Sequence, residues 1–488
     1  MEITVLMFTV VIGALLMILL VLLKGANEYI YESKLGDKKF SLPPGDLGWP
    51  VIGNMLSFLM AFKSNDPDSF INSYVKRYGR IGIYKSFMFG SPTILVTIPE
   101  LCKQVLMDEE RFPTGWPQTA VELMGKKSFI GISAEEHKRL RKLTSAPVNG
   151  HEALSVYLEY IENQVVSTLE KWSNMGEIEY LSQVRKLTFR IIMYVFLSEA
   201  SEDLMVALEK EYSTLNYGVR AMQINVPGFA YYKALKARKN LVRLLQSVVD
   251  ERRTRREKCE PPAKKDMMDN LMDCEDENGR KLTDEEIIDV LIMYLNAGHE
   301  SSGHTIMWVT VLLEQHPDVF HKAKAEQEEI VRNMPPTQKG VTLKEFRQME
   351  YLNKVIDEVM RFINISLMVF RVASADVNIN GYLIPKGWKV QVWLRNVHKD
   401  PEVHPDANKF DPSRWDRYPQ KAGTFIPFGM GSRLCPGNDL AKLEIAVYLH
   451  HFLLNYRLER VNPNCRIMNL PHRRPTDNCL GRIKKNSG

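Results

Sequence analysis

The chain has 488 residues, of which 45% are hydrophobic and 25% are charged, and its formal net charge is +5. These fractions are typical of a globular protein and argue against a disordered or fibrous one. A net charge this small gives no reason to expect nucleic acid as a partner. The six cysteines lie far apart, without a CxxC pair or a zinc-like spacing. They indicate a reducing compartment and no disulfide framework.

The N-terminal segment is long and apolar enough to cross a membrane. The range 3–23 holds 21 residues without a charge, and a bilayer core needs about 20. A cleaved signal peptide, the alternative, has a shorter apolar region preceded by basic residues, whereas here only Glu2 precedes it. Lysines follow from Lys24 onwards, which places the remaining chain in the cytosol. We predict a transmembrane anchor over residues 1–24 and a further membrane contact at 226–232, where aromatic residues suit an interface.

The rest of the chain is expected to form one catalytic domain, over residues 51–488. Pro43 and Pro44 fix the backbone and disfavour a helix, so the range 25–50 is predicted to be a Pro-rich hinge. Helical periodicity dominates, and the fold class is predicted to be mainly α with a minor β-sheet. The clearest helical runs are residues 152–172 and 351–362, and the clearest strand-like runs are residues 94–98 and 389–394.

The most polar interruption of this domain is the range 251–281. It contains ERRTRREKCEPPAKK and DCEDENGRK. Its charge and adjacent prolines predict an exposed connection. The basic half could also meet an acidic redox partner, although nothing in the local sequence demands one.

The strongest chemical signal surrounds Cys435. A glycine-containing loop leads into this cysteine, and Pro-Gly then opens an amphipathic helix. A helix N-terminus and backbone N–H groups favour a thiolate, and Gly431 and Gly437 let the backbone approach a flat ligand closely. Arg433 is placed to meet an anionic group. A buried cysteine is usually a small apolar residue, but that interpretation leaves the glycines and the arginine unexplained.

This segment resembles the haem-binding signature of the cytochromes P450, F-x-x-G-x-x-x-C-x-G, met by Phe428, Gly431, Cys435 and Gly437. The resemblance implies the cytochrome P450 fold and a haem b cofactor (iron protoporphyrin IX) with Cys435 as axial ligand of the iron and Arg433 at a propionate. It also implies electrons from NADPH through an NADPH–cytochrome P450 reductase. The enzyme is then expected to be a single-pass protein of the endoplasmic reticulum membrane with a cytosolic catalytic domain.

A long helix is predicted to begin at a capping box formed by Thr283 and Glu286 and to end near Gln315. Gly298 lies in its middle. A glycine there costs about 0.5–1 kcal/mol relative to alanine. We therefore expect another group to approach the helix closely at this position.

Glu300 and Ser301 follow this glycine, and an acid with an alcohol can relay protons to reduced oxygen. The pair resembles the A/G-G-x-D/E-T motif of the cytochromes P450, with serine where threonine is usual. A metal site of the HExxH type is excluded, because His299 and His304 are five residues apart and lie on different helix faces.

Glu358 and Arg361 have the i, i+3 spacing of an intrahelical ion pair. The same resemblance implies that they form a buried network with Arg414 that supports the haem pocket. It also implies haem contacts from Arg371, from Arg141 and from His137, which replaces the tryptophan of W-x-x-x-R.

Within the superfamily the chain resembles the plant ent-kaurenoic acid oxidase branch, through AGHESSGHTIMW, RKLTFRIIMY, NYGVRAM and CPGNDLAKLEI. This implies oxidation of a polycyclic terpenoid, first ent-kaurenoic acid in gibberellin biosynthesis. The alternative is a triterpenoid oxidase of specialised metabolism, with a limonoid- or β-amyrin-type substrate. A non-catalytic haem protein and a peroxide-rearranging enzyme without a reductase are further rivals, and the pair Glu300 and Ser301 argues against both.

The chain also departs from this branch. It reads EVMR where the branch reads ETLR, and Met430 replaces a small residue. Met368 and Val372 stand where threonine and glutamate are expected. This stretch borders the substrate in the family, and its apolar residues, Ile365, Leu367, Met368 and Val369, are predicted to line a pocket for a rigid hydrocarbon skeleton.

Overall fold

The computed structural model describes residues 25–486, except residues 65, 199, 220, 222, 259–264, 419 and 471. Its described parts form two compact units, one within Met1–Gly115 and Leu367–Asp400 and the other within Trp116–Ser366 and Pro401–Gly488. The predicted anchor over residues 1–24 lies outside the described residues. Among the helices of the described ranges, none is long and apolar enough to cross a membrane.

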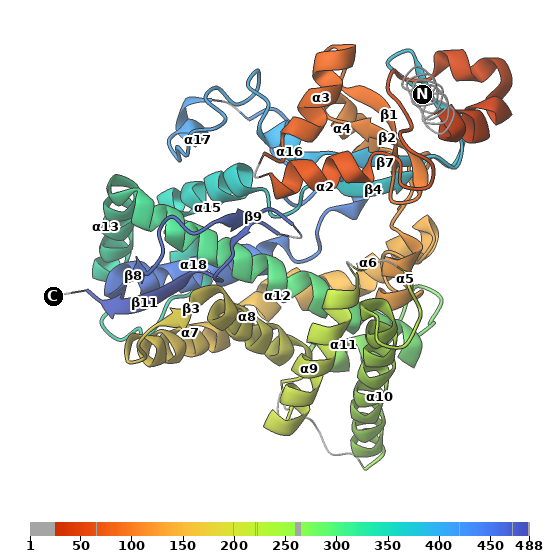
Figure 1. Ribbon diagram of the computed structural model, residues 1–488. Helices are drawn as coiled ribbons and strands as arrows, with labels where there is room; N and C mark the ends of the chain where they lie inside the picture. Colours follow the sequence, from red (N-terminus) through yellow and green to blue (C-terminus); the bar gives the residue numbers. More distant parts are fainter. Residues whose placement is uncertain are drawn as a thin grey trace, which may run out of the picture. The chain divides into compact units, whose positions relative to one another are not determined.

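The first unit is built on a four-stranded sheet with the order β1-β2-β7-β4 (Figure 1). The two strand-like runs of the sequence overlap its parallel pair, β2 and β7, so both predictions are confirmed. Leu47 is fully buried, and Asn27 Nδ2 donates to its carbonyl oxygen at 3.0 Å, so the segment predicted as a hinge is packed into this unit. The elements are η1 (Ser33–Ser41), α2 (Met55–Lys63), α3 (Ser69–Tyr78), β1 (Ile83–Met88), β2 (Ser91–Val96), α4 (Pro99–Met107), β4 (Val369–Val372), β5 (Val377–Ile379), β6 (Tyr382–Ile384), β7 (Lys389–Val392) and α16 (Leu394–His398).

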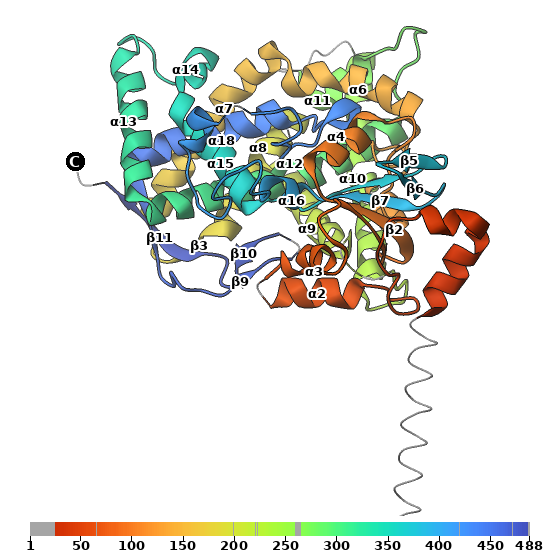
Figure 2. The ribbon, with the colours of Figure 1, turned by 90° about the horizontal axis from the view of Figure 1, so that it is seen from above.

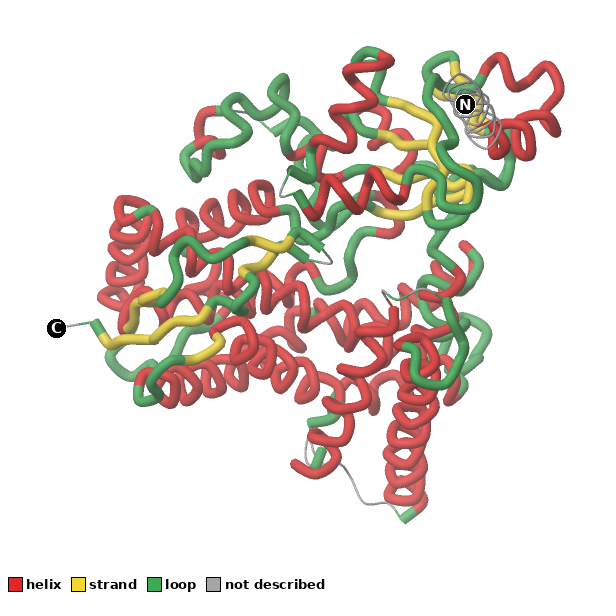
Figure 3. Tube along the Cα trace, viewed as in Figure 1, coloured by secondary structure: helices red, strands yellow, loops and turns green. Residues whose placement is uncertain are grey.

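The second unit is mainly helical, as Figure 3 shows, and carries a small sheet with the order β3-β11-β8. Both predicted helical runs are confirmed, as α7 and α15. The helices α7 and α18 lie side by side (Figure 2). The helices are α5 (Gln118–Met124), α6 (Ala134–Asn149), α7 (His151–Ser173), α8 (Tyr180–Phe196), α9 (Glu202–Val219), α10 (Ala230–Glu257), α11 (Met267–Asp273), α12 (Asp284–Gln315), α13 (Pro317–Asn333), α14 (Leu343–Gln348), α15 (Glu350–Ile363), α17 (Arg414–Arg417), η2 (Gly431–Arg433) and α18 (Asn438–Asn455). The strands are β3 (Ile178–Glu179), β8 (Tyr456–Arg460), β9 (Ile467–Met468), β10 (Arg474–Pro475) and β11 (Leu480–Lys485).

The long helix α12 runs between α8 on one side and α15 and α18 on the other (Figure 1). The capping box of Thr283 and Glu286 is present, and the helix ends at Gln315, as predicted. The close approach expected at Gly298 is also confirmed. A Cβ on this residue would lie 3.0 Å from Cδ1 of Ile192 in α8. Glycine at 298 thus lets two helices of the core pack closely together.

In the described part of the range 251–281, residues 277–281 are exposed as predicted, but other residues are packed into helices. It contains the end of α10 and the whole of α11. Arg252 is buried and donates to both carboxylate oxygens of Asp266, at 2.6 and 2.7 Å. The prediction was wrong for Arg252 and Asp266, because their charge was taken as a sign of solvent exposure, whereas paired opposite charges can be buried. Arg253 and Arg256 also pair with aspartates, so much of this basic segment is neutralised within the unit.

Candidate functional site

Cys435 lies in a tight loop between η2 and α18. Its backbone N–H donates to the carbonyl oxygen of Phe428 at 2.9 Å. This hydrogen bond closes the loop that runs from Phe428 to Cys435. Gly429 and Gly431 have φ angles of +76° and +75°, in the left-handed region that favours glycine. The two glycines thus allow the sharp turn that brings Phe428 and Cys435 together.

Cys435 is half-buried, and the desolvation of its thiol raises its pKa above the ordinary value. The backbone N–H of Gly437 and the charge of Arg141 lower the same pKa. Desolvation outweighs both, so the net shift of this pKa is upward. A directly bound metal cation deprotonates a coordinating thiol outright, because its charge compensates the burial.

Arg433 and Arg141 approach the same region from two segments. The Nη1 of Arg433 donates to the carbonyl oxygen of Phe129 at 2.7 Å. The Phe129 ring packs on the buried His137, at a centroid distance of 5.4 Å, and Arg141 lies one helical turn further along α6. The structure thus brings Cys435, Arg433, Arg141 and His137 together within the second unit.

These residues fit a haem group. The half-buried Cys435 is influenced by the Gly437 amide and by the charge of Arg141, and a second guanidinium, that of Arg433, lies two residues before it. A Cβ at Gly437 would meet no heavy atom within 4 Å, so the backbone is open to a flat ligand there. Cys435 would hold the iron, and Arg141 and Arg433 would meet the propionates. Arg371 lies on β4 of the first unit, where it is buried, and its propionate role stays a prediction.

The carboxylate of Glu300 is buried between helices. It accepts hydrogen bonds from Nη2 of Arg185 on α8 and, at 2.7 Å, from Nδ2 of Asn216 on α9. His299 and His304 each place a ring nitrogen 3.8 Å from a carboxylate oxygen. Burial lowers the pKa of His304 to about 3, so this ring is neutral at physiological pH. Arg185 is a cation that balances the charge of Glu300.

The hydroxyl of Ser301 points elsewhere. It donates to the carbonyl oxygen of Ala297 at 2.9 Å, one turn earlier in α12. Ala297 is exposed and Met293 and Ser301 are half-buried, although most of this helix is buried. Positions i, i+4 and i+8 share one helix face. Met293, Ala297 and Ser301 thus form a stripe of α12 that other protein atoms leave partly exposed, and this stripe carries the Ser301 hydroxyl. Glu300 lies on a neighbouring face of the helix that is buried.

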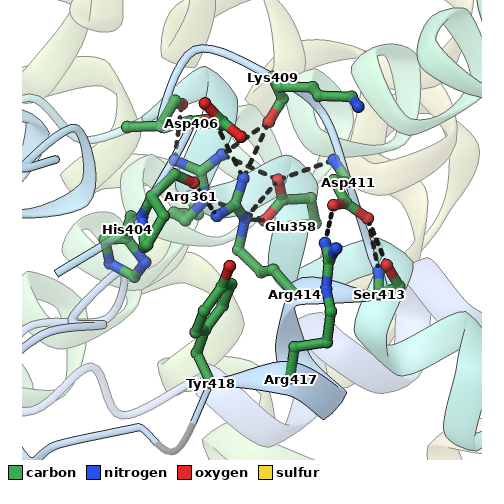
Figure 4. Close-up of polar contacts among 12 residues, drawn as sticks. Glu358, Arg361, His404, Asp406, Lys409, Asp411, Ser413, Arg414, Arg417 and Tyr418 are labelled. Atoms are coloured by element: carbon green, nitrogen blue, oxygen red, sulfur yellow. Dashed lines mark hydrogen bonds and ion pairs between the residues drawn. The ribbon is translucent and has the colours of Figure 1, made fainter.

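Glu358, Arg361 and Arg414 meet in a buried network (Figure 4). The Nε and Nη2 atoms of Arg361 donate to the two carboxylate oxygens of Glu358, each at 2.8 Å. Nε of Arg414 lies 3.1 Å from both oxygens, and the Asp411 amide donates to the same carboxylate at 3.0 Å. Backbone carbonyl oxygens of Pro405 and neighbouring residues accept the remaining guanidinium N–H groups. The excess positive charge is thus stabilised by peptide dipoles.

Three residues that contact the candidate site were not predicted from the sequence. Arg185 and Asn216 donate hydrogen bonds to Glu300, and Asn149 donates one to the loop that carries Cys435. Asn216 carried a signal in the sequence, because it is a polar residue beside Tyr212 and Leu215 on an otherwise apolar helix face. Buried polar groups need partners. Asn149, at the end of α6, donates through Nδ2 to the carbonyl oxygen of Pro436.

A comparison with models of protein families matches the Cytochrome P450 family over residues 43–475. The chain belongs to the cytochrome P450 family. Membership makes it a haem-dependent monooxygenase. The mainly α prediction with a minor sheet is also confirmed.

Curated relatives and a solved structure extend the similarity over most of this cytochrome P450. It is 64% identical over 463 residues to Ent-kaurenoic acid oxidase 2 of Arabidopsis thaliana, covering 95% of this chain and 94% of the relative. It is 49% identical to Beta-amyrin 11-oxidase of Glycyrrhiza uralensis, with coverage of 95% and 94%. A retinoic-acid-bound cyanobacterial structure, CYP120A1, matches with a TM-score of 0.81 and 27% identity, covering 91% of this chain and 99% of that one.

Proposed function

We propose that this cytochrome P450 oxidises ent-kaurenoic acid in gibberellin biosynthesis. The proposal rests on one observation, the 64% identity over nearly the whole length of a relative named for that substrate, against 49% for the relative named for β-amyrin. Bound haem supplies the oxidising centre, because a thiolate ligand favours O–O cleavage at the iron. The chain's own residues must hold this group, orient the substrate and deliver protons.

Ser301 and Glu300, the two residues proposed to deliver protons, lie on different faces of α12. Ser301 lies on the uncovered stripe, where its hydroxyl donates to the Ala297 carbonyl oxygen. Glu300 holds its carboxylate against Arg185 and Asn216. A proton passing from the acid to the alcohol therefore needs a bridging water or a turn of the Glu300 side chain away from Arg185. Arg185 is one-third exposed, so this carboxylate also has a polar connection toward solvent.

A triterpenoid substrate is the second candidate. Met368 and Val372 replace the threonine and glutamate expected in the branch, and both side chains are half-buried. Removing a hydroxyl and a carboxylate makes this stretch more apolar, which suits a substrate with fewer polar groups than a diterpenoid acid. This observation favours a β-amyrin- or limonoid-type skeleton.

We infer a single-pass attachment to the endoplasmic reticulum membrane, with reduction by an NADPH–cytochrome P450 reductase. The uncharged range 3–23 supports the anchor. In the first unit, α2 and the loop before it expose large apolar side chains, such as Val51 at 82% and Leu56 at 53%. Val226 and Phe229 of the second unit are about half exposed. Such surfaces suit a lipid interface.

A competition assay tests the substrate. Microsomes that contain this protein and a plant reductase are offered ent-kaurenoic acid and β-amyrin together, and the products are identified by mass spectrometry. Microsomes with the variant Cys435→Ser serve as the control. We expect NADPH-dependent oxidation of ent-kaurenoic acid. Turnover of β-amyrin with none of the diterpenoid would overturn the gibberellin proposal and support the second candidate.

A further inference from the structure

Asp289 on α12 is a buried carboxylate that has no part in the haem chemistry described so far. Its side chain is 1% exposed, and its two oxygens accept hydrogen bonds from two different segments. Arg238 on α10 donates to Oδ1 through Nη2 at 2.6 Å. The backbone N–H of Lys127, between α5 and α6, donates to Oδ2 at 3.0 Å. Asp289 therefore joins α12 both to a helix and to a connecting segment.

Lys127 belongs to a tight turn over residues 125–129, which we call the 125–129 turn. The N–H of Ser128 donates to the carbonyl oxygen of Gly125 at 3.2 Å, and the Ser128 hydroxyl donates to the same oxygen at 2.7 Å. Gly125 has a φ of +110°, and a Cβ on it would lie 2.1 Å from Cγ of Asp289. Glycine at this position thus lets the turn lie directly against the carboxylate.

Phe129 ends this turn and connects it to the candidate haem site. Its carbonyl oxygen accepts the hydrogen bond from Nη1 of Arg433 at 2.7 Å. Its buried ring stacks on Tyr294 of α12, at a centroid distance of 5.5 Å, and packs edge-on against His137. Two residues of α12, Asp289 and Tyr294, thus hold the 125–129 turn, one near its middle and the other at its end.

The direction of the Arg433 guanidinium depends on this turn. A guanidinium is planar and carries its N–H donors in a fixed fork, so holding one of them orients the others. The Phe129 carbonyl oxygen holds Nη1 of Arg433, and the place of that carbonyl is set by the 125–129 turn. Asp289 is therefore linked to Arg433 through printed steps of the backbone, namely the Lys127 amide and the Phe129 carbonyl.

We propose that Asp289 is a positioning residue for the haem group, which fixes the 125–129 turn so that the Phe129 carbonyl oxygen orients Arg433 toward a propionate. This rests on the proposed role of Arg433 at a propionate. Asp289 acts through its hydrogen bond with the Lys127 amide, whereas its ion pair with Arg238 keeps the buried carboxylate charged. Loss of this carboxylate should weaken the retention of haem.

The test measures how fast ferric haem leaves the loaded enzyme for excess apomyoglobin, which captures released haem. Asp289→Leu should release haem about tenfold faster than the wild type, as is typical when a residue that orients a ligating group is lost. The propionate bending bands in its resonance Raman spectrum should shift. Asp284→Leu is the matched control, because Asp284 also joins α12 to α10, through Arg253, with side chains 24% and 51% exposed. It should keep the wild-type rate and bands.

A double-mutant cycle with Arg433→Leu tests whether Asp289 acts through Arg433. Arg433→Leu alone should also speed the release of haem. In that background Asp289→Leu should change the rate less than twofold, because the group that it orients is gone. The variant that combines Asp289→Leu with Arg238→Met leaves no unpaired buried charge. It should release haem as fast as Asp289→Leu, and it replaces that variant in the cycle if Asp289→Leu alone does not fold.

Four outcomes would overturn the proposal. The first is a wild-type release rate in the folded Asp289 variants. The second is a tenfold effect of Asp289→Leu in both backgrounds, which would show that it acts independently of Arg433. The third is equal acceleration by Asp284→Leu, which would indicate a general loosening between α12 and α10. The fourth is a wild-type release rate in Arg433→Leu, which would contradict the role of Arg433 at a propionate. None of these changes which terpenoid the wild-type enzyme oxidises, so the proposed function is judged separately, by its products.

Discussion

Replacing Glu358 by glutamine removes the carboxylate charge that two buried guanidinium groups share. The side chains of Glu358 and Arg361 have no exposed surface, and that of Arg414 is 2% exposed. Removing one partner of a buried ion pair costs about 3–5 kcal/mol, because the charge that remains cannot be hydrated. We expect Glu358→Gln to lower the free energy of unfolding by this amount, a large part of the about 5–15 kcal/mol that a typical domain has.

This loss is measured by unfolding the haem-loaded protein in guanidinium chloride. Tryptophan fluorescence and the Soret band report the unfolding. The matched control is Glu328→Gln. Glu328 pairs with Lys324 at 3.6 Å in a helix, with side chains 48% and 28% exposed. An exposed pair contributes about 0–1 kcal/mol. Equal destabilisation by the two substitutions would refute the reasoning, because burial would then not determine what the charge contributes.

Three further predictions concern other parts of the molecule. Burial raises the pKa of Glu444 to about 8, so the native state keeps a proton that the unfolded state loses near 4.5. Stability should therefore fall by about 3–4 kcal/mol between pH 5 and 8, and Glu444→Gln should remove that slope in unfolding titrations; an unchanged slope would contradict the burial argument. Glu300→Gln and Ser301→Ala should retain haem but lower product formed per NADPH consumed, and full coupling in both would count against the proton relay. Deletion of residues 1–23 should release the protein from membranes with its haem in place, whereas haem loss would make that segment part of the fold.

Local patterns predicted the elements whose determinants lie close together in the chain. The box of Thr283 and Glu286 marked the start of α12, because both residues act within one helical turn. The loop around Cys435 was equally readable, since its glycines and the helix start are contiguous. Amphipathic periodicity was sufficient for α7 and α15 for the same reason.

Contacts between distant segments could not be read in this way. Glu300 is separated by 115 residues from Arg185, and Asn149 by 287 residues from Pro436. No local pattern joins such pairs, which depend on how helices pack. Adjacency in sequence also suggested that Glu300 and Ser301 act side by side, whereas consecutive residues of a helix lie on different faces. The buried Arg252 was missed because its partner Asp266 lies beyond a stretch of charged residues.

The carbon monoxide difference spectrum of the variant Cys435→Ser tests the central claim most directly. We assign the iron ligand to this cysteine, because among the cysteines that the structure describes only Cys435 combines the glycine loop, the Gly437 amide and the charge of Arg141. The wild-type protein should show the red-shifted Soret band of a haem thiolate in its reduced carbon monoxide complex, and the folded, haem-loaded variant should lack it. Survival of that band in the variant would contradict the assignment.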